Sequence, residues 1–249
     1  SKVDDKGKRS ASFMVSQLTK ELINSAKRII IITYLFNGSI LESFLKLKGF
    51  NIEKFKDYEI KEIPLVDVVK RIDLLPYDKK MLGCKLNSTW WKNATAEQIK
   101  DVGNFIRRSC MKTKVDSDLV MWTCPSNRVK ANDKSPKKGK NYLQPQAYSR
   151  DSVGNTLWLG CNVRATNAFE HKKMVIHCYN RYPHVGVQAY LREYGVKVDE
   201  DRFAVAEMLQ WIFRANCRKI DGHITLAIAS KRMYDLYVKW TKGGFYDEF

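Results

Sequence analysis

The alternation of short apolar runs and helical patterns along the C-terminal part of the chain restricts the fold most. Strand-like apolar runs occupy residues 156–163, 173–179 and 224–229. Apolar residues at helical spacing predict helices over residues 183–194, 202–217 and 230–240. Strands that alternate with helices in this way are typical of α/β proteins with a parallel sheet.

Two further apolar runs extend this pattern into the N-terminal half. Residues 28–36 contain four consecutive isoleucines, and residues 119–124 form a second run. Continuous runs of this kind predict strands that are covered on both faces, as in a central parallel sheet. Helices are predicted over residues 13–27, 39–48 and 96–110. We therefore expect an α/β domain whose central, mostly parallel sheet has helices on both faces.

The remaining segments determine the expected domain organisation. Residues 1–12 are polar and charged, and we expect them to be a leader or a flexible junction. We expect residues 13–249 to form a single domain that carries a basic insertion over about residues 58–155. Trp90 and Trp91 lie in this insertion, where they can stack on bases or simply pack in the interior.

The charge of the chain points to a polyanionic partner. Its 44 Lys and Arg residues outnumber 27 acidic residues, which gives a net charge of +17. Such an excess repels itself in the compact state, whereas neutralising phosphates releases counterions and favours binding. Nucleic acid is therefore the expected partner, and a protein that is merely basic is the alternative. The loop over residues 126–142 contains Lys137, Lys138 and Lys140, which are typical of a solvated loop or of a phosphate contact.

Cysteine spacing and hydropathy argue against other classes of protein. No two of the six cysteines stand in a C-x-x-C spacing, and none pairs with a histidine in a metal-finger pattern. We expect buried thiols in a reducing compartment and no metal site. The longest apolar run, residues 29–36, is too short to cross a membrane. The sequence therefore predicts a cytoplasmic protein without a membrane partner.

Three polar residues stand four apart in the predicted helix over residues 202–217. Gln210, Arg214 and Arg218 would project from one face of that helix. Two aligned guanidinium groups suit the dispersed charge of phosphate groups, which arginine binds in bidentate fashion. A solvated charged face, with Glu207 paired to Arg214, is the alternative.

The same residues resemble a known motif. The sequence QWIFRANCR over residues 210–218 is similar to the last motif of superfamily 2 helicases, Q-x-x-G-R-x-x-R. Phe213 stands where the motif has glycine, and Arg218 comes one residue late. The resemblance implies that Arg214, with Arg218 and Gln210, faces ATP held on another domain. The arginines would then stabilise charge that develops on the γ-phosphate.

Residues 162–167 are similar to the preceding motif of that family, which links the nucleic-acid backbone to the nucleotide site. The resemblance implies that Arg164 and Thr166 contact the backbone and that Asn167 bridges to the arginine helix. An ordinary turn after a strand is the alternative. Three shorter segments also match that family, namely residues 179–180, 199–201 and 228–233. Taken together, residues 156–240 look like the C-terminal, RecA-like domain of phage and prophage DEAD/DEAH-type helicases.

A complete enzyme of this class needs a phosphate-binding loop ending in Gly-Lys-Ser/Thr and an acidic pair for Mg²⁺, and the sequence contains neither. The resemblance therefore implies that ATP and Mg²⁺ are held mainly by an N-terminal helicase domain, supplied in cis or in trans. DNA is expected in preference to RNA, in the cytoplasm of a bacterial host.

Two other functions fit the sequence. Asp151, Glu170 and Lys172 form a pattern that can bind Mg²⁺ and activate water, as in a nuclease. A non-enzymatic nucleic-acid-binding phage protein on a degenerate RecA-like scaffold fits the charge equally well.

Overall fold

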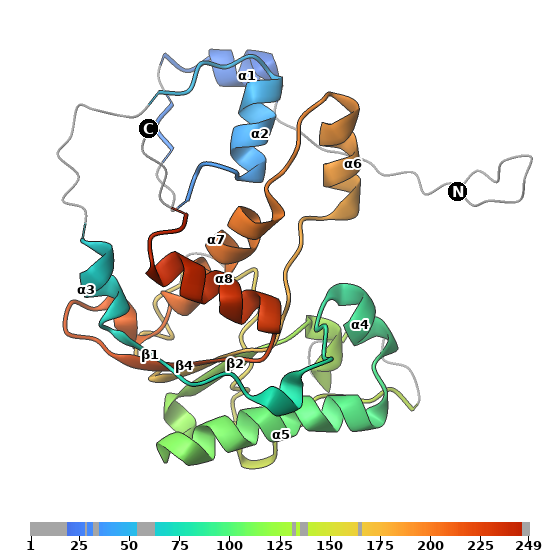
Figure 1. Cartoon of the computed structure of the whole chain (residues 1–249), viewed down its shortest axis with the longest axis vertical. Coiled ribbons are helices and arrows are strands. Elements are labelled where there is room, and N and C mark those ends of the chain that lie inside the picture. Colours follow the sequence, from blue (N-terminus) through green and yellow to red (C-terminus); the bar gives the residue numbers. More distant parts are fainter. Residues whose placement is uncertain are drawn as a thin grey trace, which may run out of the picture. The chain divides into compact units, whose positions relative to one another are not determined.

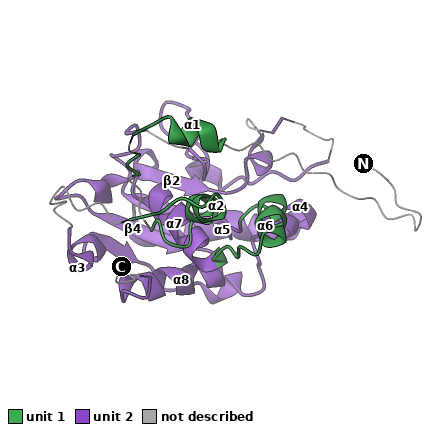
Figure 2. Cartoon of the chain, turned by 90° about the horizontal axis from the view of Figure 1, so that it is seen from above, with its two compact units in different colours: residues 1–59, 183–200, 249 green, residues 60–182, 201–248 purple. Residues whose placement is uncertain are grey.

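The computed structural model describes residues 19–27, 29–31, 35–53, 63–130, 133–134, 139–163 and 166–245. The chain forms two compact units, which Figure 2 colours separately. One comprises residues 1–59, 183–200 and 249, and the other comprises residues 60–182 and 201–248. We call them the small unit and the sheet unit.

A parallel sheet forms the centre of the sheet unit. Its four strands are β1 (Ile72–Leu74), β2 (Val120–Thr123), β3 (Met174–His177) and β4 (Ile224–Ile228). They lie in the order β1-β4-β3-β2, and every neighbouring pair is parallel. Figure 1 shows α5 (Ala96–Thr113) on one face of the sheet, and α7 (Glu200–Ile212) and α8 (Lys231–Thr241) on the other. The predicted α/β architecture, with a parallel sheet and helices on both faces, is confirmed.

Helix α5 is long because its sequence favours both its start and its amphipathic course. Thr95 and Gln98 form a capping box at its N-terminus, which satisfies two backbone donors. Its apolar face packs with the sheet in one core cluster, in which Val102, Ile106 and Trp122 are almost completely buried. Burial of each such side chain contributes about 1.5–3 kcal/mol. The helix ends at Thr113, and the next residue, Lys114, takes a left-handed conformation with φ 50°.

The sheet unit also contains short helices. These are α3 (Leu65–Val69), α4 (Ser88–Asn93) and the 3-10 turns Lys79–Met81, Ser117–Leu119, Ser126–Arg128, Gln146–Tyr148 and Asn216–Arg218. Trp91 of α4 is buried, and its ring meets that of Trp90 edge-on at 5.2 Å. The two tryptophans therefore contact each other, and Trp91 packs in the core.

The segment expected as an insertion, residues 58–155, is part of the sheet itself. It supplies β1, β2 and α5, so the expectation that this segment is an insertion within the domain is corrected. The strand β1 is hard to recognise from sequence because it has three residues and Asp73 stands at its centre. Its place is decided by backbone pairing with β4, since Asp73 lies opposite Thr225.

The strand predicted over residues 28–36 is also corrected. The described residues Ile29, Ile30 and Ile31 are not in a strand, and they are 52%, 49% and 39% exposed. Residues 28 and 32–34 lie outside the described part. The isoleucines belong to the small unit, whereas all four strands belong to the sheet unit. A high β-propensity does not form a strand without a partner strand to pair with.

A strand was predicted over residues 156–163, but only residues 157–159 pair with β2, and residues 161–162 form a turn. The Trp122 amide donates to the Leu157 carbonyl at 3.0 Å, and the Leu159 amide donates to the Trp122 carbonyl at 2.8 Å. These bonds make one isolated parallel bridge between Trp122 and Trp158. The segment thus covers the outer edge of β2 without becoming a regular strand.

The small unit contains α1 (Lys20–Asn24), α2 (Ile40–Leu47) and α6 (Val185–Glu193). Ser39 caps α2 as the sequence predicts, because its hydroxyl accepts from the Glu42 amide at 3.0 Å. Helices α2 and α6 contact each other. The expected leader, residues 1–12, lies outside the described part. Among the described residues, no helix is both long and apolar enough to span a membrane.

Candidate functional site

The three residues expected on one helical face are separated by a break in the helix. Helix α7 ends at Ile212, Arg214 lies in the following turn, and Arg218 lies in a 3-10 turn. Ala215 between them is extended, with ψ −174°. The prediction of one continuous helix that aligns Gln210, Arg214 and Arg218 is therefore wrong.

Asn216 explains why the helix stops. Its amide nitrogen donates to the Glu170 carbonyl at 3.0 Å, and its side-chain oxygen accepts from the His223 amide at 2.9 Å. Its backbone amide donates to the Lys172 carbonyl at 3.0 Å. An asparagine that satisfies neighbouring backbone groups in this way competes with continuation of the helix. These bonds hold the turn against the amino ends of β3 and β4.

The expected contact between Asn167 and the arginine segment is present. The Arg218 guanidinium donates to the Asn167 side-chain oxygen. Lys219 forms an ion pair with Glu170 at 3.4 Å beside it. The Thr166 hydroxyl accepts from the Ala168 amide at 3.2 Å, which is a local turn bond. Arg164 lies outside the described residues.

This cluster lies at the edge of the sheet where β3 and β4 begin. Residues 166–172 lead into β3, and residues 214–223 lead into β4. Ligands of open α/β sheets generally bind at the opposite edge, outside the carboxyl ends of the strands. The cluster therefore differs in position from the usual ligand site of such sheets.

Two residues of the nuclease alternative, Asp151 and Lys172, lie near enough to each other that the charge of Asp151 opposes the lowering of the Lys172 pKa by burial. The Lys172 ammonium donates to the Asp118 carbonyl at 2.7 Å, whereas Glu170 pairs with Lys219. The Asp151 carboxylate accepts from the Asn155 amide at 2.7 Å in its own turn. Within the described residues, no group of three or more His, Cys, Asp and Glu side chains is placed to hold a metal ion.

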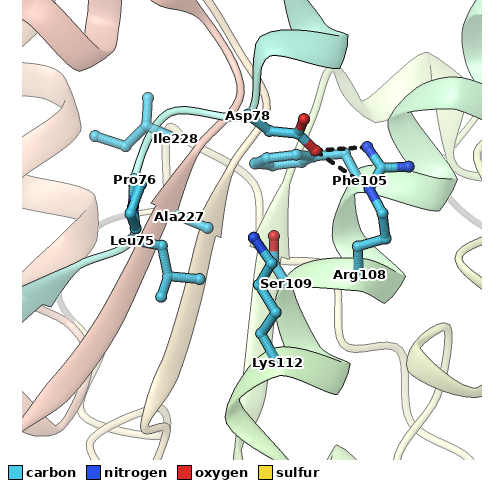
Figure 3. Close-up of a pocket in the computed structure, with 9 residues that line it drawn as sticks. All are labelled: Leu75, Pro76, Asp78, Phe105, Arg108, Ser109, Lys112, Ala227 and Ile228. Carbon is cyan, nitrogen blue, oxygen red and sulfur yellow. Dashed lines mark hydrogen bonds and ion pairs between the residues drawn. The ribbon is translucent and has the colours of Figure 1, made fainter.

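The carboxyl edge of the sheet has a small pocket between β1, β4 and α5 (Figure 3). After β1 the chain continues to α5 on one face of the sheet, and after β4 it continues to α8 on the other face. The carboxyl edge between β1 and β4 is therefore the topological switch point of the sheet. Asp78 and Arg108 form an ion pair of 2.6 Å there. Burial opposes ionisation of Asp78, but the hydrogen bond and charge of Arg108 hold the pKa of this carboxyl below its ordinary value. The Asp78 and Arg108 side chains that line the pocket therefore neutralise each other.

A larger hollow lies along the first half of α5, and we call it the α5 groove. Its volume is about 380 Å³, which falls within the range of roughly 300–1,000 Å³ for small-molecule sites. One wall is α5 and the other is the segment over residues 140–146. The lining residues are Ala96, Ile99, Lys100, Gly103, Asn104, Arg107, Lys140, Asn141, Tyr142, Gln144 and Gln146.

Two residues outside the second wall, Gly103 and Arg128, hold it in place. A Cβ atom on Gly103 would lie 3.3 Å from the Gln144 carbonyl oxygen, so glycine lets the segment approach the helix closely. Arg128 is buried, and its guanidinium donates to the Asn141 carbonyl and to the Lys92 carbonyl, each at 3.0 Å. In return, the Leu143 amide donates to the Arg128 carbonyl at 2.9 Å. The groove is therefore built on anchored backbone.

The lining of the α5 groove is positively charged. Lys100, Asn104 and Arg107 stand at helical spacing and face it together. Lys140 contributes a third cation, and none of the lining residues is acidic. Lys140 itself pairs with Asp133 at 2.6 Å.

Arg107 differs from the other half-buried arginines of this unit. Its Nε atom is shielded from solvent, and its side chain has no hydrogen bond or ion pair anywhere in the described chain. By contrast, Arg108 pairs with Asp78, and Arg181 pairs with Glu207 at 2.8 Å. A shielded N–H donor without a partner is costly, and an anion bound by this guanidinium would offset that cost.

The sequence indicated part of this surface. Lys140 was expected to contact nucleic acid and lines the groove, whereas Lys137 and Lys138 lie outside the described residues. Lys100 and Arg107, which also line the groove, were not among the expected site residues. Their seven-residue spacing on a predicted helix places them on one face, but which loop would lie opposite that face is not visible in the sequence.

Comparison with known proteins places the chain in a family. Residues 66–241 match the family model described as the YonV C-terminal Rossmann-like domain. The chain belongs to this family. It is also similar to the SPbeta prophage-derived uncharacterized protein YonV of Bacillus subtilis (strain 168). The two are 25% identical over 241 residues, which cover 92% of this chain and 55% of the relative. No solved structure matches the chain.

The family assignment agrees with the observed architecture. A four-stranded parallel sheet in the order β1-β4-β3-β2, with helices on both faces, is a Rossmann-like arrangement. The matched region includes β1, α5 and β2, so the segment expected as an insertion belongs to the family domain. The chain spans just over half the length of its prophage relative.

Proposed function

We propose that this domain binds nucleic acid through its phosphate backbone and that the α5 groove is the contact surface. Arg107 is the observation that carries the proposal. Its Nε atom is shielded from solvent, its guanidinium has no partner in the described chain, and it lines a groove together with Lys100 and Lys140. Arginine presents several donors in a planar fork, which suits phosphate oxygens.

The charge of the whole chain supports the same partner. An excess of 17 positive charges raises the local concentration of a polyanion and speeds its association. Each phosphate that a cation neutralises releases condensed counterions, so binding weakens as salt concentration rises. A small anion would also satisfy Arg107, but it would not account for the large net charge.

Binding of a fluorescent DNA oligonucleotide across a salt series tests the proposal. Arg107→Gln and Lys100→Gln should each weaken binding, and each should lower the slope of log affinity against log salt by about 0.7–0.9. Lys112→Gln is the matched control, because Lys112 is an exposed lysine on α5 that lines the other pocket. Equal slopes for the wild type and both groove variants would refute binding in the groove.

A second candidate function concerns the amino edge of the sheet. There, Arg214 and Arg218, with Gln210, would complete an ATPase site whose ATP and Mg²⁺ are held by an N-terminal helicase domain. Thr166 and Asn167 would contact DNA beside it. The Arg218–Asn167 bond supports this candidate, because it joins the two segments that resemble helicase motifs. The length of the prophage relative leaves room for a further domain.

ATP hydrolysis by a full-length family member, with and without DNA, tests this candidate. Replacing the equivalent of Arg214 with alanine should lower the DNA-stimulated rate by about 10³-fold or more if it acts as an arginine finger. DNA binding should stay unchanged in that variant. An unchanged rate, or no ATP hydrolysis by the wild type, would remove the helicase assignment and leave nucleic-acid binding to be judged separately.

A further inference from the structure

The α5 groove is lined by carboxamide side chains as well as by cationic ones. Four of its lining residues have carboxamide side chains, namely Asn104, Asn141, Gln144 and Gln146. None of these side chains forms a hydrogen bond within the part of the chain that the structure describes. Each carboxamide offers donors and an acceptor side by side. The groove therefore combines phosphate-binding groups with groups that can read the edge of a base.

The backbone near Gln146 supports a functional role for this wall. Gln146 has φ 55°, in the left-handed region that a residue with a side chain rarely adopts. Such a conformation costs of order 1 kcal/mol and must be held by its surroundings. Gln146 follows the buried Pro145, and its left-handed conformation places its side chain at the groove.

The form of the groove distinguishes a single strand from a duplex. Proteins that read a duplex insert a helix or a ribbon into its grooves, whereas an unpaired base enters a hollow in the protein. Here the first half of α5 forms one wall of a hollow, and the segment over residues 140–146 forms the other. A space of about 380 Å³ suits one nucleotide and is far too small for a base pair with both backbones.

We propose that the α5 groove holds one nucleotide of an unpaired strand, with its phosphate at Arg107 and Lys100 and its base edge at the carboxamides of the opposite wall. This inference rests on the proposed function, since it names the form of nucleic acid that the groove takes. Gln144 is the most informative of the carboxamides. Its side chain is exposed in the groove, while only its backbone carbonyl contacts Gly103.

Abasic oligonucleotides separate base contacts from phosphate contacts. The probes are a fluorescent mixed-sequence DNA single strand, the same strand with abasic sites throughout its centre, and the matching duplex. Wild-type protein should bind the ordinary strand at least fivefold more tightly than either of the other probes. Gln144→Ala should weaken binding of the ordinary strand about fivefold and leave the abasic strand unchanged. Arg107→Gln should weaken both strands equally, because both retain their phosphates.

The outcomes distinguish the two proposals. If the duplex binds as tightly as the single strand and Gln144→Ala has no effect, the groove does not hold a base. Backbone binding still stands in that case if Arg107→Gln lowers the salt slope. If Arg107→Gln changes nothing on any probe, both proposals fail. Thermal unfolding of each variant shows whether it is folded, and Gln188→Ala is the matched control because Gln188 lies in the small unit.

Discussion

Gly103 of α5 lies so close to the Gln144 carbonyl oxygen that a Cβ atom would stand 3.3 Å from it. A glycine in the middle of an 18-residue helix costs about 1 kcal/mol relative to alanine. The absence of a side chain at Gly103 allows the two walls of the α5 groove to approach each other closely.

Replacing this glycine with a long side chain should open the contact. Gly103→Leu is expected to push the segment over residues 140–146 away from α5 and to destabilise the protein by about 1–3 kcal/mol. Urea unfolding measures the loss of stability, and the oligonucleotide assay should show weaker binding at the same time. Asp101→Leu, an exposed site on the same helix, should leave stability within about 0.5 kcal/mol of the wild type. A stable Gly103→Leu variant with unchanged binding would contradict the proposed wall.

The buried arginine behind the groove should matter for stability more than for charge. Arg128→Met removes the donors to the carbonyls of Asn141 and Lys92, which would remain without those partners. We expect a loss of about 3 kcal/mol in unfolding free energy. We also expect faster amide exchange at Leu143, whose amide donates to the Arg128 carbonyl. Unchanged protection at Leu143 would show that the segment is held by other contacts.

The stability of the sheet unit should depend on pH through His177. Burial, together with the charge of Arg181, lowers the pKa of His177 to about 3. In the unfolded chain a histidine has a pKa near 6.5. Between these values the unfolded state binds one more proton, so stability should fall as the pH drops below about 6.5. The expected loss is about 1.4 kcal/mol per pH unit, or about 2 kcal/mol between pH 6.5 and pH 5.

Unfolding in urea at pH 7 and pH 5 measures this dependence. His177→Phe should remove most of it, because phenylalanine fills the space beside Trp211 without a titrating group. His223→Gln is the control, since His223 is half exposed on the surface and pairs with Asp73. If His177→Phe and the wild type lose the same stability at pH 5, the buried histidine is not the cause.

The turn before β4 should tolerate no side chain at Gly222. A Cβ atom there would lie 1.7 Å from the Asn216 carbonyl oxygen, which is far inside van der Waals contact. Gly222→Ala should therefore cost about 3 kcal/mol or more in unfolding free energy, or force the Asn216 turn to move. Gly154→Ala is a useful contrast, because Gly154 has positive φ but open space around it. A Gly222→Ala protein as stable as the wild type would contradict the packing of this turn.

Several elements were predictable because their signal is local. The strands β2, β3 and β4 follow from continuous apolar runs, and Ser230 marks the start of α8 because its hydroxyl can cap a helix. The resemblance to helicase motifs pointed to the contact between Asn167 and Arg218, which is present. The helicase activity that it implies stays a prediction.

The sequence by itself determined the α/β class, the parallel strands of the C-terminal half and the net charge of +17, from which an anionic partner is predicted. Hydrophobic periodicity and net charge decide these properties along the chain, without reference to its folded path. Only the tertiary structure decided that Asp73 lies in a strand, that Ile29–Ile31 do not, and that α7 ends before Arg214. It also brought Arg107 opposite the segment over residues 140–146. In each case the physical reason is a contact between distant segments, because backbone pairing, side-chain bonds and close packing depend on partners that the local sequence does not name.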